Sequence, residues 1–292
     1  MISILIPTYN KICVSLVQEM YNQASDLQIP FEILVADDGS TEEIKEANNA
    51  INSLDYCHYI LLKENMGPAK IRNFLADQAK YDYLLFMDSD TMPSNNAFLK
   101  NYLEKRLKNG IVCGGLAYER KENPPMCYLR YIYGIKVEES SATQRNKSPY
   151  DKFISMCFLA SKEIFKSIRF DDKMHFGYED AWFGVLLKKA SVPIVHIDNP
   201  VYHQTTDKAE DYLHKIRISI QNLICHKEKM SKHIRLLQWY EKIERMHLSR
   251  LVCIFFQITE FLLVKNLISK HPSMHLFAFY KLGYLCYFLH KK

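Results

Sequence analysis

The 292-residue sequence has little of what marks several common protein classes. Its 9 glycines and 10 prolines are too few for a collagen-like or low-complexity chain, and 13% aromatic residues exclude disorder as the dominant state. None of its 8 cysteines forms a Cys-x-x-Cys pair, so we expect buried free thiols in a reducing compartment rather than a zinc site. No stretch reaches 18 uninterrupted apolar residues, and Gln257 and Glu260 interrupt residues 251–264, so we expect no membrane-spanning helix.

Several motifs that would assign a function are also missing. The sequence contains no Gly-x-Gly-x-x-Gly dinucleotide fingerprint, no Walker A phosphate loop and no Gly-x-Ser-x-Gly nucleophile elbow. Residues 2–6 are a short β-branched run closed by Pro7, which is not the pattern of a signal peptide. Together with the free cysteines, these observations predict a cytoplasmic protein.

The net charge is only +5, but it is unevenly distributed. Residues 205–292 carry 15 Lys+Arg against 7 Asp+Glu, whereas residues 1–204 carry 23 against 26. This distribution indicates a near-neutral body that carries the chemistry and a basic, aromatic tail that binds an anionic partner. A helical tail with solvated lysines would show the same charge distribution. The small basic excess, confined to the tail, argues against nucleic-acid binding.

Strands and helices are expected to alternate in the first part of the chain. Short apolar runs predict buried strands at residues 2–6, 31–36, 59–62, 83–87 and 111–112. Helical spacing predicts helices at residues 14–24, 69–79 and 96–108, and one that begins near Thr41. Such alternation, repeated about every 25–30 residues, is typical of a Rossmann-like, mostly parallel sheet flanked by helices.

From about residue 114 the pattern becomes irregular. Residues 134–152 are polar and predict a mobile loop, a candidate lid, or a short helix. Residues 153–160 and 193–197 read as strands, and residues 176–189 become a helix. After Thr205 only helices are predicted. We therefore expect a catalytic domain over residues 1–204 and a helical, basic and aromatic extension over residues 205–292.

Acidic side chains follow two of the predicted strands. Asp88-Ser89-Asp90 comes directly after an apolar strand, and two such carboxylates suit Mg²⁺ or Mn²⁺, which can hold a diphosphate. Asp37-Asp38 ends another strand and offers a carboxylate for a nucleoside base. Both pairs are equally compatible with ordinary turns. Because ligands bind beyond the carboxyl ends of parallel strands, we expect these segments at one site.

Three further features add chemistry. Gly67 permits close backbone approach at a helix start, where Lys70 and Arg72 favour an anion, or simply lie solvated on a surface helix. Glu179 and Asp180 lie at another helix start, where Asp180 suits either a general base or a helix cap. His203 follows a strand and suits a metal site or a plain surface position.

The order and spacing of these segments over residues 1–203 closely resemble family 2 glycosyltransferases with the GT-A fold. The resemblance rests on Ile-Pro-Thr-Tyr-Asn at residues 6–10, Ala-Asp-Asp-Gly-Ser-Thr at 36–41, Phe-Met-Asp-Ser-Asp at 86–90 and Gly-Tyr-Glu-Asp at 177–180, with Asn65, Gly67, Arg72, Asn73 and His203. It implies an inverting hexosyl- or N-acetylhexosaminyltransferase that moves a sugar from a nucleotide-sugar, expected to be a UDP-sugar, to a hydroxyl. The expected acceptor is a glycan or lipid-linked molecule in surface polysaccharide synthesis.

The resemblance also implies residue roles. Residues 1–113 would form the nucleotide-sugar half and residues 114–204 the acceptor half. The donor site would comprise Pro7, Thr8 and Tyr9 along the nucleoside, Asp38 and nearby Arg72 at the base, and Asp88 at the ribose or sugar, completed by Gly67, Lys70 and Ser89. Asp90 and His203 would bind the Mn²⁺ or Mg²⁺, while Asp180 would be the catalytic base, with Glu179 toward the acceptor.

Some alternatives stay open. A non-catalytic nucleotide-sugar-binding or scaffold protein, a retaining transferase and a nucleotidyltransferase remain competing interpretations, and the apolar Ala181-Trp182-Phe183 leaves the acceptor class undefined. In the tail, apolar residues 251–264 and 276–289 are flanked by lysines that include Lys265 and Lys292. Residues 251–292 would either dock peripherally on the cytoplasmic face of the inner membrane, pack on the body or form a homo-oligomer interface.

Overall fold

The computed structural model describes residues 1–120, 127–204 and 207–291, so Lys292 lies outside the described part. The chain forms two compact units. Unit 1 consists of Met1–Tyr118, Glu139–His175 and Glu179–Gln204, and unit 2 of Glu119–Glu138, Phe176–Tyr178 and Thr205–Lys292. The domain boundary expected between residues 204 and 205 stays a prediction, and residues 205–206 are not described.

Unit 1 is built on a seven-stranded sheet with the order β3-β2-β1-β4-β8-β6-β9. The strands are β1 (Ile2–Thr8), β2 (Phe31–Asp37), β3 (Cys57–Leu61), β4 (Tyr83–Met87), β6 (Ile111–Cys113), β8 (Cys157–Ser161) and β9 (Ile194–His196). Neighbouring strands run parallel except at β8, which is antiparallel to both β4 and β6. This sheet confirms the predicted α/β fold class.

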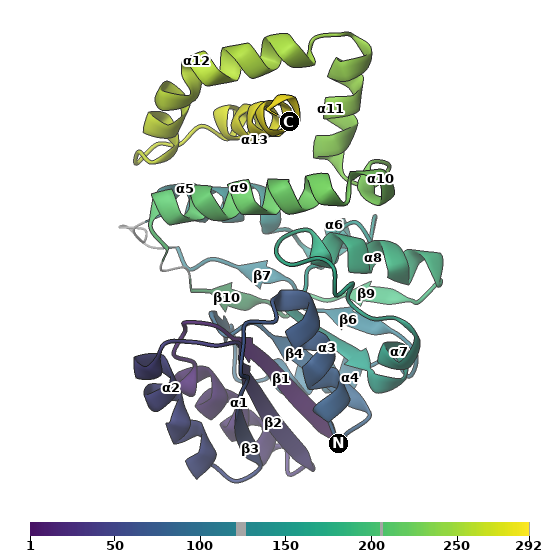
Figure 1. Cartoon of the computed structure of the whole chain (residues 1–292). Helices are drawn as coiled ribbons and strands as arrows, with labels where there is room; N and C mark the ends of the chain where they lie inside the picture. Colours follow the sequence, from purple (N-terminus) through teal and green to yellow (C-terminus); the bar gives the residue numbers. More distant parts are fainter. Residues whose placement is uncertain (121–126, 205–206, 292) are drawn as a thin grey trace. The chain divides into compact units, whose positions relative to one another are not determined.

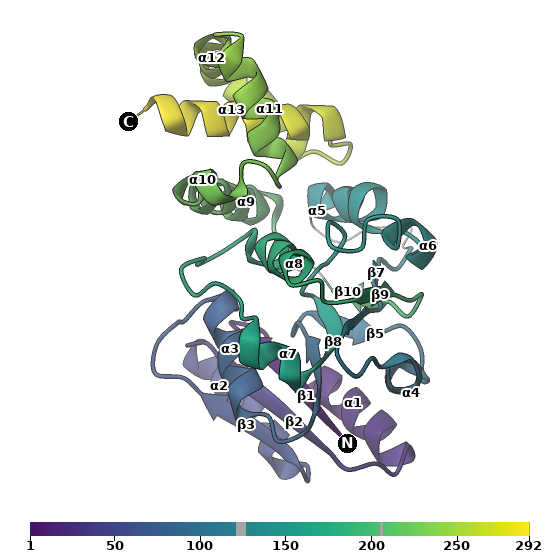
Figure 2. The ribbon, with the colours of Figure 1, turned by 90° about the vertical axis from the view of Figure 1, so that its right-hand side faces the viewer.

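Helices cover both faces of this sheet. In Figure 2, α3 (Pro68–Gln78) and α7 (Lys162–Ser167) lie on one side, while α1 (Val14–Asp26) and α4 (Phe98–Lys105) lie on the other. The remaining helices of unit 1 are α2 (Glu42–Asn48), α6 (Ala142–Arg145) and α8 (Glu179–Lys189), with a 3₁₀ turn at Asn49–Ser53. Apolar side chains recur on the inward side of α1, where Leu16, Val17 and Met20 are buried, as an amphipathic helix requires.

Phenylalanines dominate the core on the α3 side of the sheet. Phe86 of β4 stacks on Phe158 of β8 with ring centroids 4.7 Å apart, and Phe170 stacks on Phe183 at 4.1 Å. Each of these rings is almost completely buried. Because Phe183 belongs to α8, this packing positions the helix whose first two residues are Glu179 and Asp180.

A second, three-stranded sheet was not predicted. It consists of β5 (Thr91–Pro93), β10 (Val201–His203) and β7 (Leu116–Ala117), in the order β5-β10-β7. β10 is antiparallel to β5 and pairs His203 with Thr91 in register. Strands of two or three residues are too short for a hydrophobic period to show in the sequence. Residues 91–93 and 201–203, which are far apart in the sequence, nevertheless meet here.

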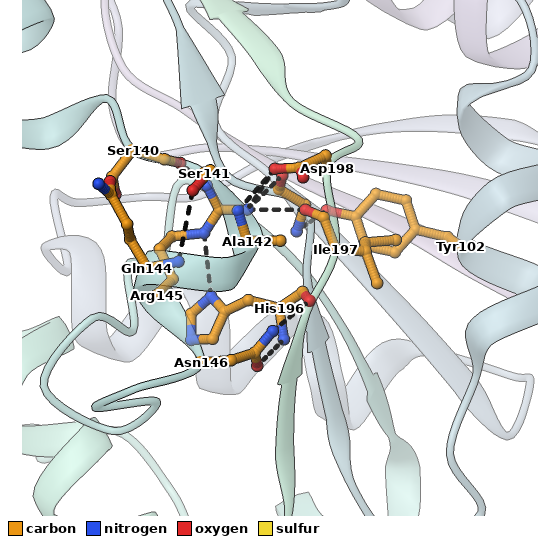
Figure 3. Close-up of polar contacts among 11 residues, drawn as sticks. Tyr102, Ser140, Ser141, Ala142, Gln144, Arg145, Asn146, His196, Ile197 and Asp198 are labelled. Carbon is orange, nitrogen blue, oxygen red and sulfur yellow. Dashed lines mark hydrogen bonds and ion pairs between the residues drawn. The ribbon is translucent and has the colours of Figure 1, made fainter.

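The polar segment expected as a mobile loop or short helix is held by one buried arginine. Arg145, at the end of α6, donates through Nη2 to the carbonyl oxygens of Gly114 (3.0 Å) and Ile197 (2.7 Å) and through Nη1 to that of Ser140. Its Nε donates to His196 Nδ1 at 3.2 Å, as Figure 3 shows. Arg145 therefore ties residues 140–145 to the ends of β6 and β9, and this part of the segment is a short helix.

Replacing Arg145 by alanine is expected to destabilise the protein by about 3 kcal/mol, because several buried acceptors lose their donor at once. The exposed Arg106 bonds to the nearby Leu103 carbonyl oxygen and lies over the Tyr83 ring at 5.6 Å, so Arg106→Ala should change the free energy of unfolding by less than about 1 kcal/mol. Urea unfolding of the two variants measures the difference. Equal urea midpoints of unfolding for the two variants would contradict the role of Arg145 in fixing residues 140–145 to the ends of β6 and β9.

Unit 2 is helical in its described residues. It contains α5 (Tyr128–Tyr133), a π-helical turn (Gly134–Glu138), α9 (Ala209–Cys225), α10 (Lys227–Met230), α11 (Arg235–Arg245), α12 (Ser249–Leu267) and α13 (Met274–His290). α13 packs between α12 and α9, and its Phe277, Tyr280 and Leu285 are buried (Figure 1). Across this contact, Arg217 of α9 donates to the Tyr280 hydroxyl at 2.6 Å. The helical C-terminal part confirms the predicted helices of the tail.

Within the described residues, no single helix has the length and apolar composition needed to cross a membrane. In the same part of the chain, α11 and α12 taken together have the required length and composition, but the two are bent by 115° relative to each other.

Candidate active site

The carboxyl ends of β1 and β2 are joined by hydrogen bonds, as the parallel sheet predicts. The Asp38 backbone N–H donates to the Thr8 carbonyl oxygen at 2.9 Å, and the Asn10 N–H donates to Ser40 Oγ at 2.7 Å. The Asn10 side chain in turn accepts from the Thr41 N–H at 3.0 Å. The segments that follow β1 and β2 therefore form one connected edge of the sheet.

Asp38 is buried at this edge and holds the loop before α3. Its carboxylate accepts hydrogen bonds from the backbone N–H groups of Met66 (2.6 Å) and Gly67 (2.9 Å). Burial raises the pKa of Asp38, and these two donors oppose that rise. Gly67 has φ +81°, and a Cβ there would lie 2.9 Å from the His175 carbonyl oxygen, so this approach requires glycine.

Arg72 is the central cation of the site. It projects from α3, is only 4% exposed, and donates through Nη2 to Asp88 Oδ1 at 2.6 Å. Its Nη1 lies 3.7 Å from Glu179 Oε1, at the start of α8. Within the described residues, Arg72 Nε and Glu179 Oε2 are buried without a hydrogen-bond partner. Arg72 thus bridges Asp88, after β4, and Glu179, the first residue of α8, and the unpaired polar atoms can bind a ligand or water.

Two carboxylates near Arg72, those of Asp88 and Asp180, have raised pKa values. Burial, followed by repulsion from Glu179, raises the pKa of Asp180 to about 7, although Arg72 opposes the rise. Burial likewise raises the pKa of Asp88 to about 6, against the attraction of Arg72. A carboxyl group with a pKa near 7 can both accept and release a proton near neutral pH, which is what a general base requires.

Asp90 and His203 meet across the small sheet. The β5–β10 pairing and a hydrogen bond from the Gln204 N–H to the Asp90 carbonyl oxygen (2.7 Å) hold their backbones together. His203 Nε2 lies 3.1 Å from Asp90 Oδ2, and the Tyr118 ring stands edge-on to the imidazole with centroids 5.6 Å apart. The two residues are 113 positions apart in the sequence.

This pair fits the predicted divalent ion. Two neighbouring ligands about 2.1 Å from one Mg²⁺ lie about 3 Å apart, which matches the 3.1 Å between Asp90 Oδ2 and His203 Nε2. A carboxylate oxygen suits Mg²⁺ and Mn²⁺, and the nitrogen of a neutral imidazole is a common metal ligand. No group of three or more His, Cys, Asp or Glu that could hold a metal occurs in the described part of the chain. The protein would therefore supply two ligands, and phosphate oxygens or water the others.

The other predicted donor residues lie at the same edge. Pro7 and Thr8 end β1, and Tyr9 follows with 55% of its surface exposed. Lys70 lies in the first turn of α3, two residues before Arg72, and Ser89 stands between Asp88 and Asp90. Trp182, in α8, is buried. Sequence reasoning missed the contact between Arg72 and Glu179, since nothing local links α3 to α8.

The chain resembles known glycosyltransferases in sequence and structure. An uncharacterized glycosyltransferase of Haemophilus influenzae is 29% identical over 199 residues, which are 67% of this chain and 75% of that protein. Residues 1–349 of Staphylococcus aureus TarS superpose with a TM-score of 0.53 at 18% identity, over 99% of this chain and 91% of that one. The structure of the same TarS residues in complex with UDP superposes with a TM-score of 0.50 at 19% identity, again over 99% of this chain and 91% of that one.

The mannosyltransferase PcManGT of Pyrobaculum calidifontis, solved in complex with GDP-Man and Mn²⁺, superposes with a TM-score of 0.54 at 14% identity, over 78% of this chain and 64% of that one. At these identities the superpositions establish a shared fold. The profile of the family described as Glycosyl transferase family 2 matches residues 3–169, the stretch that carries Asp38, Arg72, Asp88 and Asp90. The chain therefore belongs to glycosyl transferase family 2.

Proposed function

We propose that this glycosyltransferase moves a hexosyl or N-acetylhexosaminyl group from a nucleotide-sugar, a UDP-sugar in the first instance, to a hydroxyl of a glycan or lipid-linked acceptor, with inversion at the anomeric carbon. The observation that carries the proposal is the cluster of Asp88, Arg72, Glu179 and Asp180, in which the pKa of Asp180 is raised to about 7. The UDP complex of TarS supports a uridine nucleotide as the first donor to test.

The donor would lie along the edge formed by the ends of β1 and β2. In this proposal the backbone of Pro7, Thr8 and Tyr9 follows the nucleoside, and Asp38, already fixed by Met66 and Gly67, faces the base. Lys70 and the start of α3 face the phosphates, because a helix N-terminus and a lysine both attract anions. Asp88 and Ser89 follow β4 at the ribose or sugar.

Asp90 and His203 would hold Mn²⁺ or Mg²⁺, as the 3.1 Å between their ligand atoms allows. When bound, the ion supplies positive charge to stabilise the diphosphate that leaves. The GDP-Man and Mn²⁺ complex of PcManGT supports this assignment.

Asp180 would act as the general base. Its carboxylate takes the proton of the acceptor hydroxyl while that oxygen forms a bond to the anomeric carbon. The bond from the anomeric carbon to the diphosphate oxygen breaks with its electron pair, and a single displacement inverts the configuration. Glu179, one residue earlier, is fixed by Arg72 and faces the acceptor side. Arg72 orients both acids and does not itself exchange a proton.

A donor and product assay tests the function. The full chain is incubated with Mn²⁺ and a panel of UDP-, GDP-, CMP- and dTDP-sugars, and release of the nucleotide is followed with and without glycan acceptors. We expect turnover with one nucleotide class and, by NMR of the product, an anomeric configuration opposite to that of the donor. Retention of configuration would contradict the single displacement, and binding without turnover would contradict the proposed base.

Removing either proposed metal ligand is expected to abolish metal-dependent donor binding. With Mn²⁺ and UDP, the wild type should gain several degrees in melting temperature, because a ligand that binds only the folded state stabilises it. Asp90→Asn and His203→Asn should lose most of that gain. His58→Asn, an exposed histidine on β3, serves as the matched control and should keep it. An undiminished gain in Asp90→Asn would contradict the metal site.

A further inference from the structure

The outer side of α12 carries an apolar face that is not covered in the described structure. Phe261 is 77% and Ile258 74% exposed, and their neighbours on the same side are also more than half exposed: Leu251, Ile254, Phe255 and Leu262. Their spacing of three and four residues places them on one side of the helix. Exposed apolar patches of this kind mark interaction surfaces.

The opposite side of α12 is packed within unit 2. Cys253, Phe256, Leu263 and Leu267 are buried, and Phe256 packs edge-on against Tyr280 of α13 with ring centroids 5.6 Å apart. The acid on α12, Glu260, also turns inward and pairs with Arg217 of α9 at 2.8 Å. The exposed face of α12 therefore carries no carboxylate. The buried side of α12 is fixed by its contacts with α13 and α9.

The part of the chain that contains this face is basic, with eight Lys+Arg and three Asp+Glu from Arg235 to Lys291. Arg250 and Lys265 lie at the two ends of α12, so each end of the apolar face has a cation with a long side chain. Two copies of this face would bring like charges together, whereas a surface of phosphate headgroups over hydrocarbon complements both the cations and the apolar side chains.

We propose that α12 is an interfacial helix that lies flat on an anionic lipid bilayer and presents Leu251, Ile254, Phe255, Ile258, Phe261 and Leu262 to the acyl chains. Its 19 residues span about 28 Å along the membrane plane. Arg250 and Lys265 extend toward lipid phosphates from the two ends. This inference rests on unit 2 alone and is independent of the proposed donor chemistry.

Vesicle flotation tests the proposal with the full chain. Vesicles of phosphatidylcholine with about 40% phosphatidylglycerol should carry the wild type to the top of the gradient, and pure phosphatidylcholine vesicles should carry much less, because electrostatic attraction contributes to binding. Ile258→Ser/Phe261→Ser should reduce the bound fraction at least about tenfold, since two large apolar side chains no longer enter the bilayer. The matched control is Tyr56→Ser/Leu61→Ser, a pair in unit 1 whose members are 65% and 56% exposed, which should float like the wild type.

A second variant and a second measurement separate the alternatives. Arg250→Gln/Lys265→Gln should weaken flotation with anionic vesicles and leave the weak binding to neutral vesicles unchanged. Sedimentation equilibrium on the wild type and on Ile258→Ser/Phe261→Ser shows whether this face joins two copies. A wild type that stays at the bottom with anionic vesicles would overturn the proposal. So would a dimer that dissociates in Ile258→Ser/Phe261→Ser while flotation is unaffected.

Discussion

Asp180→Asn is expected to lower kcat by about 10²–10⁴-fold while leaving UDP binding intact, because a general base contributes roughly that factor. The same substitution should stabilise the protein at pH 8. Burial raises the pKa of Asp180 to about 7, so the folded state resists ionisation of this group and carries an uncompensated charge at high pH. Asparagine keeps the shape without the charge.

The signs of the pH effects follow from this raised pKa. A folded-state pKa of about 7 against an ordinary 3.8 means that the folded protein binds this proton more tightly, so stability falls as the pH rises from about 4 to about 7. Asp180→Asn should therefore be more stable than the wild type by up to about 4 kcal/mol at pH 8, and the difference should shrink toward pH 4. Wild-type activity should rise with pH through about 7, where the base loses its proton.

Thermal melts from pH 4 to pH 8 and a pH–rate profile check these expectations. Asp151→Asn removes an exposed carboxylate of unit 1 and should change neither stability nor activity. An Asp180→Asn variant that is active, or one that is less stable at pH 8 than at pH 5 relative to the wild type, would contradict the assignment of Asp180 as a buried base.

Arg72→Met is expected to cost about 3–5 kcal/mol of stability and most of the activity. The guanidinium bonds Asp88 at 2.6 Å and lies 3.7 Å from Glu179, and removing one partner of a buried ion pair leaves the other charges uncompensated. The remaining acids would then repel one another, so the pKa values of Asp88 and Asp180 should rise further. The residual activity should accordingly move to higher pH.

Arg169→Met is the matched control for this substitution. Arg169 also bonds a carboxylate at 2.6 Å, but it and its partner Asp77 are 37% and 57% exposed, so its loss should cost less than about 1 kcal/mol. Arg72→Lys keeps the positive charge but lacks the planar guanidinium with its several N–H donors. Compared with Arg72→Met, it should therefore recover part of the lost stability and part of the wild-type pH profile. Chemical unfolding of the three variants makes the comparison, and equal losses in Arg72→Met and Arg169→Met would contradict the buried bridge.

The sequence alone predicted the parts of the site that local patterns encode. Short apolar runs that end in Pro7, Asp37 and Asp88 marked the strands and their carboxyl ends, and the parallel order then placed those ends together. The segments after β1 and β2 are indeed hydrogen-bonded to each other, through Asn10 and Ser40. Local hydrophobic period and turn residues suffice for this, because they act between neighbours in the chain.

Long-range pairings leave no local signal in the sequence. Only the resemblance to family 2 glycosyltransferases put Asp90 and His203 at one site, and the structure shows that two three-residue strands bring them together. The contact of Arg145 with His196, made from a short polar helix, was not predicted at all. The sequence of α12 is apolar on nearly every side, so only packing against α13 shows that Phe256 is internal and Phe261 exposed. The sequence thus determined which side chains can do chemistry. The tertiary structure decided which of them meet and which face outward, because sheet closure and helix packing depend on contacts between distant parts of the chain.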